Sequence, residues 1–242
     1  MKTCLLYASL AVLAWPLCVN AGPRGSTIED ALEVLDDLAE APEKRVPPAM
    51  LKDAAAVIIA PDVMKAGFIV GGRHGHGVLL VRQKGGWSNP VYVTISGGSV
   101  GWQAGVQATD LFLIIRNAKS LDRILRGGGK LTLGAEASVA AGPIGRDASA
   151  ATDLQLKAEI LSYSRSRGLF GGIALDGDAI TIDYIMNDRA YGERRVRVSD
   201  IVDGKATPPK QAAKLKDRLN EWTGESTTTR RPPPVSVDPP RK

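Results

Sequence analysis

A predicted β-hairpin in the second half of the chain constrains the fold most strongly. Two apolar segments, Asp153–Tyr163 and Leu169–Leu175, flank the basic turn Ser164–Gly168. The first segment begins by alternating polar and apolar residues, which is the period of a half-buried strand. The turn ends in glycine, which tolerates the positive φ that a tight turn requires. The sequence therefore predicts a hairpin that displays Arg165 and Arg167 at its tip.

Short apolar runs separated by glycine precede this hairpin. We expect Val57–Ala60 to be a strand that ends at Pro61, and the uninterrupted apolar run Leu111–Ile115 to be a central strand. Further strands are predicted at Phe68–Val70, Val78–Arg82, Val91–Ser96, Leu131–Leu133 and Glu136–Ala140. Aromatic residues make up 5% of the 242 residues, so the core must be mainly aliphatic. The pattern predicts an α+β fold, with a Gly-rich curved antiparallel β-sheet or barrel-like body and short flanking helices.

Two longer helices are predicted near the ends of the chain. The first carries Ile28, Leu32, Leu35 and Leu38 at helical spacing, with an acidic opposite face that anionic lipid would repel, so we expect it to pack on the body. The second follows Pro208-Pro209 and places Leu215, Leu219 and Trp222 on one face among Lys210, Lys214, Lys216 and Arg218. This basic amphipathic pattern fits contact with a membrane surface and docking on the chain's own domain equally well. Shorter helices are expected from Asn117 or Ser120 through Arg126, and over Asp183–Tyr191.

The N-terminus has the pattern of a secretory signal peptide. Lys2 precedes the apolar run Leu5–Leu17, and Val19–Ala21 fits the small-x-small rule, so we expect cleavage near Ala21. The expected location is outside the cytoplasm, periplasmic or membrane-associated. An uncleaved membrane helix and lipidation at Cys18 are the less favoured alternatives, because the run is short and large residues precede that cysteine. Both cysteines of the chain lie in this segment, so the remainder forms no disulfide and no cysteine metal site.

Several short motifs imitate catalytic or metal sites without completing them. Gly97–Gly101 fits the G-x-S-x-G pattern of a nucleophile elbow around Ser99, but both histidines precede this serine, whereas hydrolases of that fold place their histidine after it. His74 and His76 supply two metal ligands with no third marked by spacing. The segments 127–130 and 176–178 lack the further residues of a phosphate loop and of a calcium loop, and the second is expected to be a turn. We therefore predict no catalysis, no metal site and no cofactor.

An ordered set of motifs resembles the SYLF-domain family over about residues 47–192. The matching segments are Lys65–Gly72, Gly97–Gln103, Ala108–Asp110, Leu133–Ala135, Ala140–Arg146 and Tyr163–Gly172. SYLF domains occur in bacteria and in eukaryotic endocytic proteins, and the resemblance implies binding of acidic phospholipids without catalysis. Some eukaryotic relatives also engage actin.

Together with the patterns at the two ends of the chain, the resemblance predicts four parts: a signal peptide (1–21), a SYLF-like lipid-binding domain (22–204), the basic amphipathic helix (205–226) and a Pro-rich disordered tail (227–242). The expected partner is an acidic phospholipid membrane surface, and no nucleic acid. A protein partner on the same basic surface is the alternative.

The candidate lipid-binding residues are all cationic. An arginine binds phosphate in a bidentate manner and stays charged at any relevant pH. The opposing possibility is that such arginines pair with nearby aspartates and only stabilise turns. The predicted set consists of Arg146, Arg165, Arg167, Lys214 and Arg218.

Overall fold

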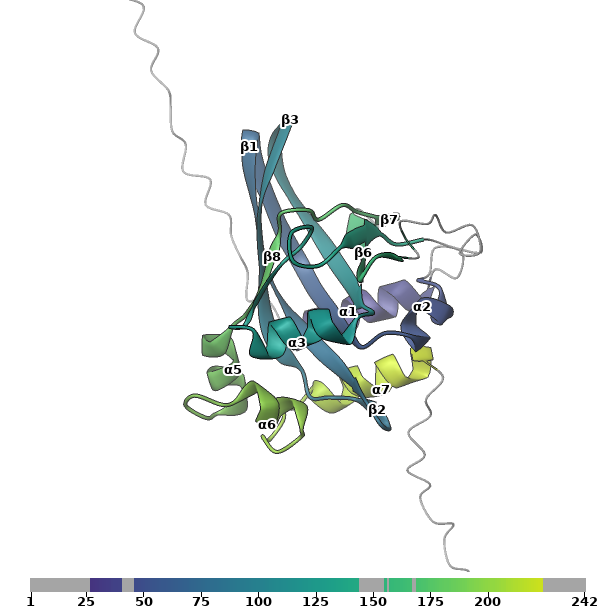
Figure 1. Ribbon diagram of the computed structural model, residues 1–242, viewed down its shortest axis with the longest axis vertical. Helices are drawn as coiled ribbons and strands as arrows, with labels where there is room; N and C mark the ends of the chain where they lie inside the picture. Colours follow the sequence, from purple (N-terminus) through teal and green to yellow (C-terminus); the bar gives the residue numbers. More distant parts are fainter. Residues whose placement is uncertain (1–26, 41–45, 144–154, 156, 167–168, 224–242) are drawn as a thin grey trace, which may run out of the picture.

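A computed structural model describes residues 27–40, 46–143, 155, 157–166 and 169–223 (Figure 1). These residues form one curled, open, mixed sheet of eight strands with short helices around it. The α+β class with a curved sheet is therefore confirmed. The strands are β1 (Ala56–Gln83), β2 (Gly86–Trp87), β3 (Val91–Ile115), β4 (Lys130–Thr132), β5 (Val139–Ala141), β6 (Ile160–Ser166), β7 (Leu169–Gly172) and β8 (Ala179–Ile182).

The sheet is built on one long antiparallel ribbon of β1 and β3. The end of β3 pairs with β6, and the beginning of β3 pairs with β8, which in turn pairs with β4. On its other edge β6 pairs with β7 in an antiparallel manner and with β5 in a parallel manner. The parallel pair makes the sheet mixed, where the sequence predicted an antiparallel one.

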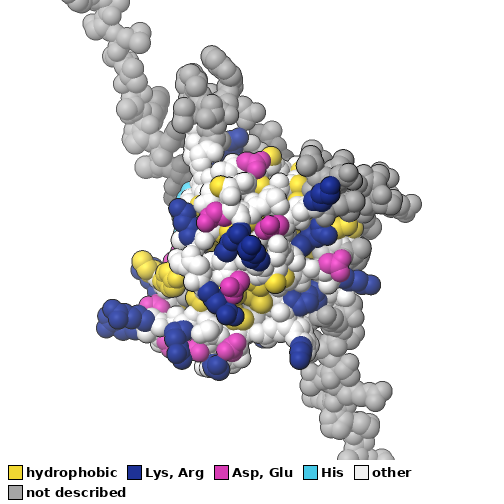
Figure 2. Space-filling view, in the orientation of Figure 1, with side chains coloured by type: hydrophobic (Ala, Val, Ile, Leu, Met, Phe, Trp, Pro, Cys, Tyr) yellow, Lys and Arg dark blue, Asp and Glu magenta, His cyan; other side chains and the backbone are white. Residues whose placement is uncertain are grey.

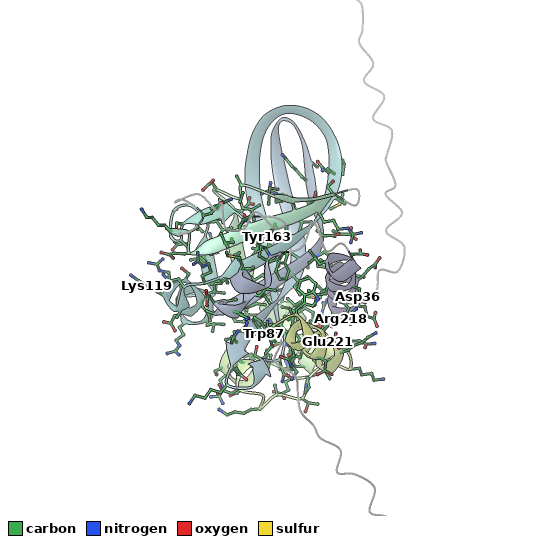
Figure 3. The ribbon with its side chains drawn as sticks, turned by 90° about the vertical axis from the view of Figure 1, so that its right-hand side faces the viewer. Asp36, Trp87, Lys119, Tyr163, Arg218 and Glu221 are labelled. Atoms are coloured by element: carbon green, nitrogen blue, oxygen red, sulfur yellow. The ribbon has the colours of Figure 1, made fainter. Side chains whose placement is uncertain are left out.

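Residues 63–73 of β1 and 97–109 of β3 form a two-stranded arch, because among the described residues this part of each strand pairs only with the other. The arch rises out of the body and curves over (Figures 1 and 3). A register shift between Phe68 and Ile69 leaves two extra residues on β3 at this point. The prediction of separate short strands was wrong here, because glycines bend the ribbon without interrupting its pairing.

A second register shift lies between Ala60 and Val63, where β1 continues past Pro61 instead of ending. Proline is tolerated at this point because a β-bulge does not need its missing N–H. Asp62 has a left-handed backbone, with φ 47°. Its N–H donates to Oδ1 of Asp110 at 3.0 Å, so a side chain of β3 closes the gap in the ladder.

Helices cover both faces of the sheet. α3 and α1 lie on opposite sides of it, as the positions of Lys119 and Asp36 show in Figure 3. Asn117 caps α3 as predicted, its side chain accepting from the N–H of Lys119 at 2.9 Å, and Asp183 caps α5 in the same way through Met186. The helices are α1 (Thr27–Glu40), α2 (Pro48–Lys52), α3 (Ala118–Arg126), α5 (Tyr184–Tyr191), α6 (Val198–Val202) and α7 (Ala212–Thr223).

The predicted C-terminal helix, α7, docks on the body with its apolar face. Leu215 and Leu219 are fully buried, and the ring of Trp222 lies 6.2 Å from that of Phe112 in β3. The core around them is mainly aliphatic, as the low aromatic content predicted. None of the helices in the described ranges is long and apolar enough to cross a bilayer.

The predicted hairpin exists as β6 and β7, with different limits. Gln155 and Lys157 are helical, so the strand begins at Ile160 and not at Asp153. Arg165 pairs with Phe170 inside the ladder, where the sequence predicted a turn. The expected signal peptide, the start of this segment and the Pro-rich tail lie outside the described residues.

Candidate functional site

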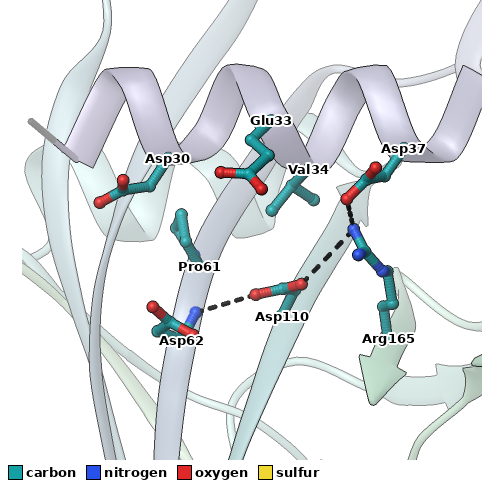
Figure 4. Close-up of a pocket in the computed structure, with 8 residues that line it drawn as sticks. All are labelled: Asp30, Glu33, Val34, Asp37, Pro61, Asp62, Asp110 and Arg165. Carbon is teal, nitrogen blue, oxygen red and sulfur yellow. Dashed lines mark hydrogen bonds and ion pairs between the residues drawn. The ribbon is translucent and has the colours of Figure 1, made fainter. Parts of the chain in front are cut away.

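Arg165 projects from β6 toward α1 and the bulge of β1, and does not extend into solvent. Its guanidinium forms an ion pair with Asp37 of α1, and Nη1 lies 3.9 Å from Oδ2 of Asp110, its register partner on β3 (Figure 4). The Arg165 side chain is 25% exposed. Of the two interpretations weighed for this residue, pairing with acidic side chains is what the structure contains, although the partners come from other elements and not from the hairpin.

The contacts of Arg165 belong to an acidic pocket of about 230 Å³ between α1 and the bulge. One arginine faces five carboxylates in it, so the pocket as a whole would repel a phosphate group. Figure 4 shows Arg165 at one side of the pocket next to Asp37 and Asp110, with Asp30 and Asp62 at the other side. The lining residues are Asp30, Glu33, Val34, Asp37, Pro61, Asp62, Asp110 and Arg165.

The electrostatics of this pocket act most clearly on Asp110. Burial raises the pKa of its carboxyl group, and the nearby charges of Asp62, Glu33 and Asp30 raise this pKa further, against the lowering effect of the hydrogen bond from the Asp62 N–H. Burial, together with the crowding of carboxylates, therefore disfavours the charged form of Asp110. Across the described part of the chain, no three His, Cys, Asp or Glu side chains are arranged to hold a metal ion.

The two predicted residues of α7 differ in their surroundings. Lys214 is exposed. Arg218 is held between two acidic side chains, with Nη2 at 2.5 Å from Oδ1 of Asp36 and Nη1 at 2.9 Å from Oε2 of Glu221 (Figure 3). Arg218 thus joins α7 to α1, and Lys214 is the more accessible of the two. Arg146 and Arg167 lie outside the described residues.

A buried ion pair at the base of the arch was not predicted. Arg73 of β1 pairs with Asp178, whose side chain is 1% exposed. Asp178 occupies the space beside Gly97, where an added Cβ would come 1.6 Å from its Oδ1. The sequence identified the turn at Asp176–Asp178 but gave no sign that one of its carboxylates reaches the arch.

The rejected catalytic motifs have no catalytic surroundings in the described residues. Ser99 lies within β3, opposite Gly71, and not at a strand-to-helix turn. His74 and His76 are exposed, with ring centroids 5.3 Å apart, and Nδ1 of His76 lies 3.4 Å from Oδ2 of Asp183. One carboxylate beside one of two histidines does not make a metal site.

The surface around α5 was not predicted from the sequence. Tyr184 and Ile185 are exposed there, and Arg189, Arg194 and Arg195 lie on the same helix or in the loop after it. The sequence signal that could have indicated this surface is the spacing of four residues between Ile185 and Arg189, because residues so spaced are neighbours on a helix surface.

The sequence is similar to known proteins over most of the elements described above. A family model described as Las17-binding protein actin regulator, Ysc84, matches residues 96–222. The chain is 34% identical over 183 residues to the SH3 domain-containing YSC84-like protein 1 of Xenopus laevis, which covers 75% of this chain and 54% of the relative. The Homo sapiens protein of the same name is 32% identical over 204 residues, covering 82% of this chain and 59% of the relative.

A yeast relative is also similar. LAS seventeen-binding protein 3 of Saccharomyces cerevisiae is 36% identical over 167 residues, which cover 68% of this chain and 36% of the relative. The chain thus spans little more than half the length of the vertebrate relatives and about a third of the yeast one. No solved structure matches the chain.

Proposed function

Because the chain belongs to the Ysc84 family, which confirms the resemblance to SYLF domains, we propose that it is a non-enzymatic module that binds acidic phospholipid membrane surfaces. The family is described as a Las17-binding protein and actin regulator, and the yeast relative is named as a binding protein; neither name is that of an enzyme. The names of the relatives do not mention a lipid, and the choice of a lipid surface as the ligand is supported by the distribution of charge on the molecule.

The observation that carries the proposal is a set of exposed cations on the helical end of the molecule that make no ion pair with another described residue. Figure 2 shows Lys and Arg side chains along the lower and left edges of the molecule, where α5, α6 and α7 lie in Figure 1. Each such cation near an anionic surface contributes about 1 kcal/mol, so several together suffice for salt-sensitive docking. The set includes Lys119, Lys130, Arg189, Arg194, Arg195, Lys210 and Lys214.

The predicted residues contribute unequally under this proposal. Lys214 belongs to the free set and needs no rearrangement to face a phosphate. To bind a lipid phosphate, Arg165 would have to break its ion pair with Asp37, and the phosphate would compete with the carboxylates of the pocket. Arg218 would have to break its ion pair with Asp36. Arg146 and Arg167 stay predictions.

Vesicle co-sedimentation tests the proposal directly. The chain is mixed with vesicles of neutral phospholipid alone, or with added anionic phospholipid, at low and at high salt. We expect binding that requires the anionic lipid and weakens as salt screens the attraction. Equal binding to both vesicle types at both salt concentrations, or no binding to either, would contradict the proposal.

A second candidate function is a protein-interaction module on the same basic surface. The family description and the yeast relative's name, both referring to binding of Las17, favour this alternative. Absence of vesicle binding together with retention of an acidic protein partner, measured with purified components, would favour it over the lipid.

We further propose that the module acts at an envelope membrane after export and cleavage near Ala21. The signal-peptide pattern of residues 1–21 supports this location. Intact-mass measurement of the protein from its native host tests it, since a mature chain that still contains Met1 to Ala21 would exclude cleavage there.

A further inference from the structure

Exposed apolar side chains stand next to the free cations on α5. Tyr184 is 53% exposed and Ile185 is 66% exposed, and the only other large hydrophobic side chain exposed to this degree in the described ranges is Val106 of the arch, also at 66%. Two adjacent residues of this kind on the first turn of a helix form a small apolar projection. A single exposed apolar residue needs no explanation, but a projection beside unpaired cations does.

The rest of α5 is fixed firmly on the sheet, which holds this projection outward. Asn187 is buried, with its Oδ1 accepting from the N–H of Tyr92 at 2.9 Å and its Nδ2 donating to the carbonyl of Tyr92 at 3.0 Å. The hydroxyl of Tyr191 donates to the carbonyl of Pro90 at 2.8 Å. The helix is therefore anchored by one face and cannot turn Ile185 inward without breaking these contacts.

Cations lie around the projection. Arg189 follows Ile185 by four residues and so neighbours it on the helix surface. The hydroxyl of Tyr184 reaches over Gly129, where an added Cβ would lie 2.6 Å from it, and Gly129 directly precedes the exposed Lys130. In Figure 2, hydrophobic and cationic side chains meet at the left edge, where Figure 1 places α5.

The acidic side chains of this region are Asp183, Asp188 and Glu193, and the charge of the exposed Glu136 interacts with that of Lys130. Both carboxylate oxygens of Asp188 accept backbone hydrogen bonds, from the N–H of Arg195 at 2.9 Å and of Val196 at 3.0 Å, and thereby fold the loop that carries Arg194 back toward α5. Asp183 caps the helix and faces His76. Glu193 is the exposed acidic residue of the loop.

We propose that this surface, consisting of Lys130, Tyr184, Ile185, Arg189, Arg194 and Arg195, is where an anionic bilayer docks. Ile185 and Tyr184 insert between headgroups while the surrounding cations face lipid phosphates. Interfacial helices bind membranes in the same way, with apolar side chains inserted and basic side chains at the phosphates. The exposed guanidinium groups of Arg189, Arg194 and Arg195, which make no ion pair with a described residue, favour an anionic surface as the occupant. This inference rests on the proposed lipid-binding function and assigns it to a site that the sequence analysis did not name.

Matched substitutions in the full chain test the site. Ile185→Asn is compared with Val106→Asn, because the two apolar side chains are equally exposed. Arg189→Gln/Arg194→Gln is compared with Lys52→Gln/Lys84→Gln, which removes the same charge from two exposed lysines away from α5. The N-terminal segment is the same in every variant, so a difference between variants does not come from it. Thermal unfolding confirms that each variant folds like the wild type.

The readout is the dissociation constant for vesicles with anionic phospholipid at low salt. We expect the double arginine variant to bind about twenty-fivefold more weakly than wild type, from about fivefold for each charge. We expect Ile185→Asn to bind about tenfold more weakly, as an apolar side chain is no longer inserted. Both control variants should stay within about twofold of the wild type, apart from the general effect of net charge.

The outcomes separate this inference from the proposed function. A wild-type chain that binds anionic vesicles, with the test variants no weaker than their controls, overturns the α5 site and leaves lipid binding intact. A wild-type chain that does not distinguish anionic from neutral vesicles overturns the proposed function, and the α5 site with it.

Discussion

The buried pair of Arg73 and Asp178 gives the sharpest test of how the arch is held to the body. The substitution Asp178→Asn keeps the shape of the side chain but removes the charge that compensates Arg73, whose side chain is 11% exposed. Breaking a buried pair from one side costs about 3–5 kcal/mol, because a desolvated charge is left without a partner. We expect a loss of this size in the free energy of unfolding, measured by urea denaturation followed by circular dichroism.

The reverse substitution, Arg73→Met, adds a dependence on pH. Burial raises the pKa of Asp178 in the folded chain, while Arg73 opposes this rise, so removing Arg73 raises the pKa further. A carboxyl group with a higher pKa in the folded state than in the unfolded state contributes stability at acidic pH, and this contribution is lost as pH rises above the unfolded value of about 3.9. Each unit of difference corresponds to about 1.4 kcal/mol. Arg73→Met should therefore be clearly less stable at pH 7.5 than at pH 4.5, relative to the wild type.

The double variant Arg73→Met/Asp178→Asn is the control, because it lacks the titrating group and should not show this added pH dependence. A loss under about 1 kcal/mol for Asp178→Asn would refute the reasoning, because the pair would then behave like one exposed to solvent. An unchanged pH dependence in Arg73→Met would refute the argument from burial.

Three further outcomes are expected, each measured as the free energy of unfolding in urea. Gly97→Ala should cost about 3 kcal/mol, because the new methyl group displaces Asp178 and breaks its pair, whereas Gly98→Ala, with no atom within 4 Å of an added Cβ, is the control and should cost much less. Asp110→Asn should gain stability relative to the wild type as pH rises from 4 to 7, because the raised pKa of Asp110 means that its folded environment favours the uncharged form. A difference in the free energy of unfolding between the two proteins that stays constant over this pH range would contradict the prediction. Leu219→Ala should cost about 2–5 kcal/mol, since its fully buried side chain fixes α7 on the core, and a cost near zero would show that α7 is not docked in solution.

Local features of the fold could be predicted from the sequence because their signals are short-range. Asn117 and Asp183 were expected where helices begin, and both cap them. The apolar face of α7 was found from its helical spacing, and Leu111–Ile115 is fully buried in the centre of the sheet. These signals depend on periodicity and capping within a few residues, which the chain itself displays.

The continuity of the long strands could not be predicted in this way. Glycines between 67 and 105 suggested breaks, but an antiparallel partner of matching curvature keeps the ladder intact across them. Pro61 likewise suggested an end, and became a bulge because Asp110 supplies a hydrogen bond to the residue that follows it. In each case a segment distant in sequence decides the outcome.

By itself the sequence determined the composition of the core, the helix limits marked by caps, the curved sheet and the family, since all of these depend on local pattern or on ordered motifs. The tertiary structure alone decided which charges are free. For Arg165 the sequence left lipid binding and pairing with an aspartate both open, and packing of α1 across the bulge brings Asp37 and Asp110 to it. Arg189 and Arg194 drew no notice in the sequence and are exposed without an ion pair to any described residue, beside Ile185. The physical reason is that an ion pair acts over a few ångströms in space, and only the packing of the elements sets those distances.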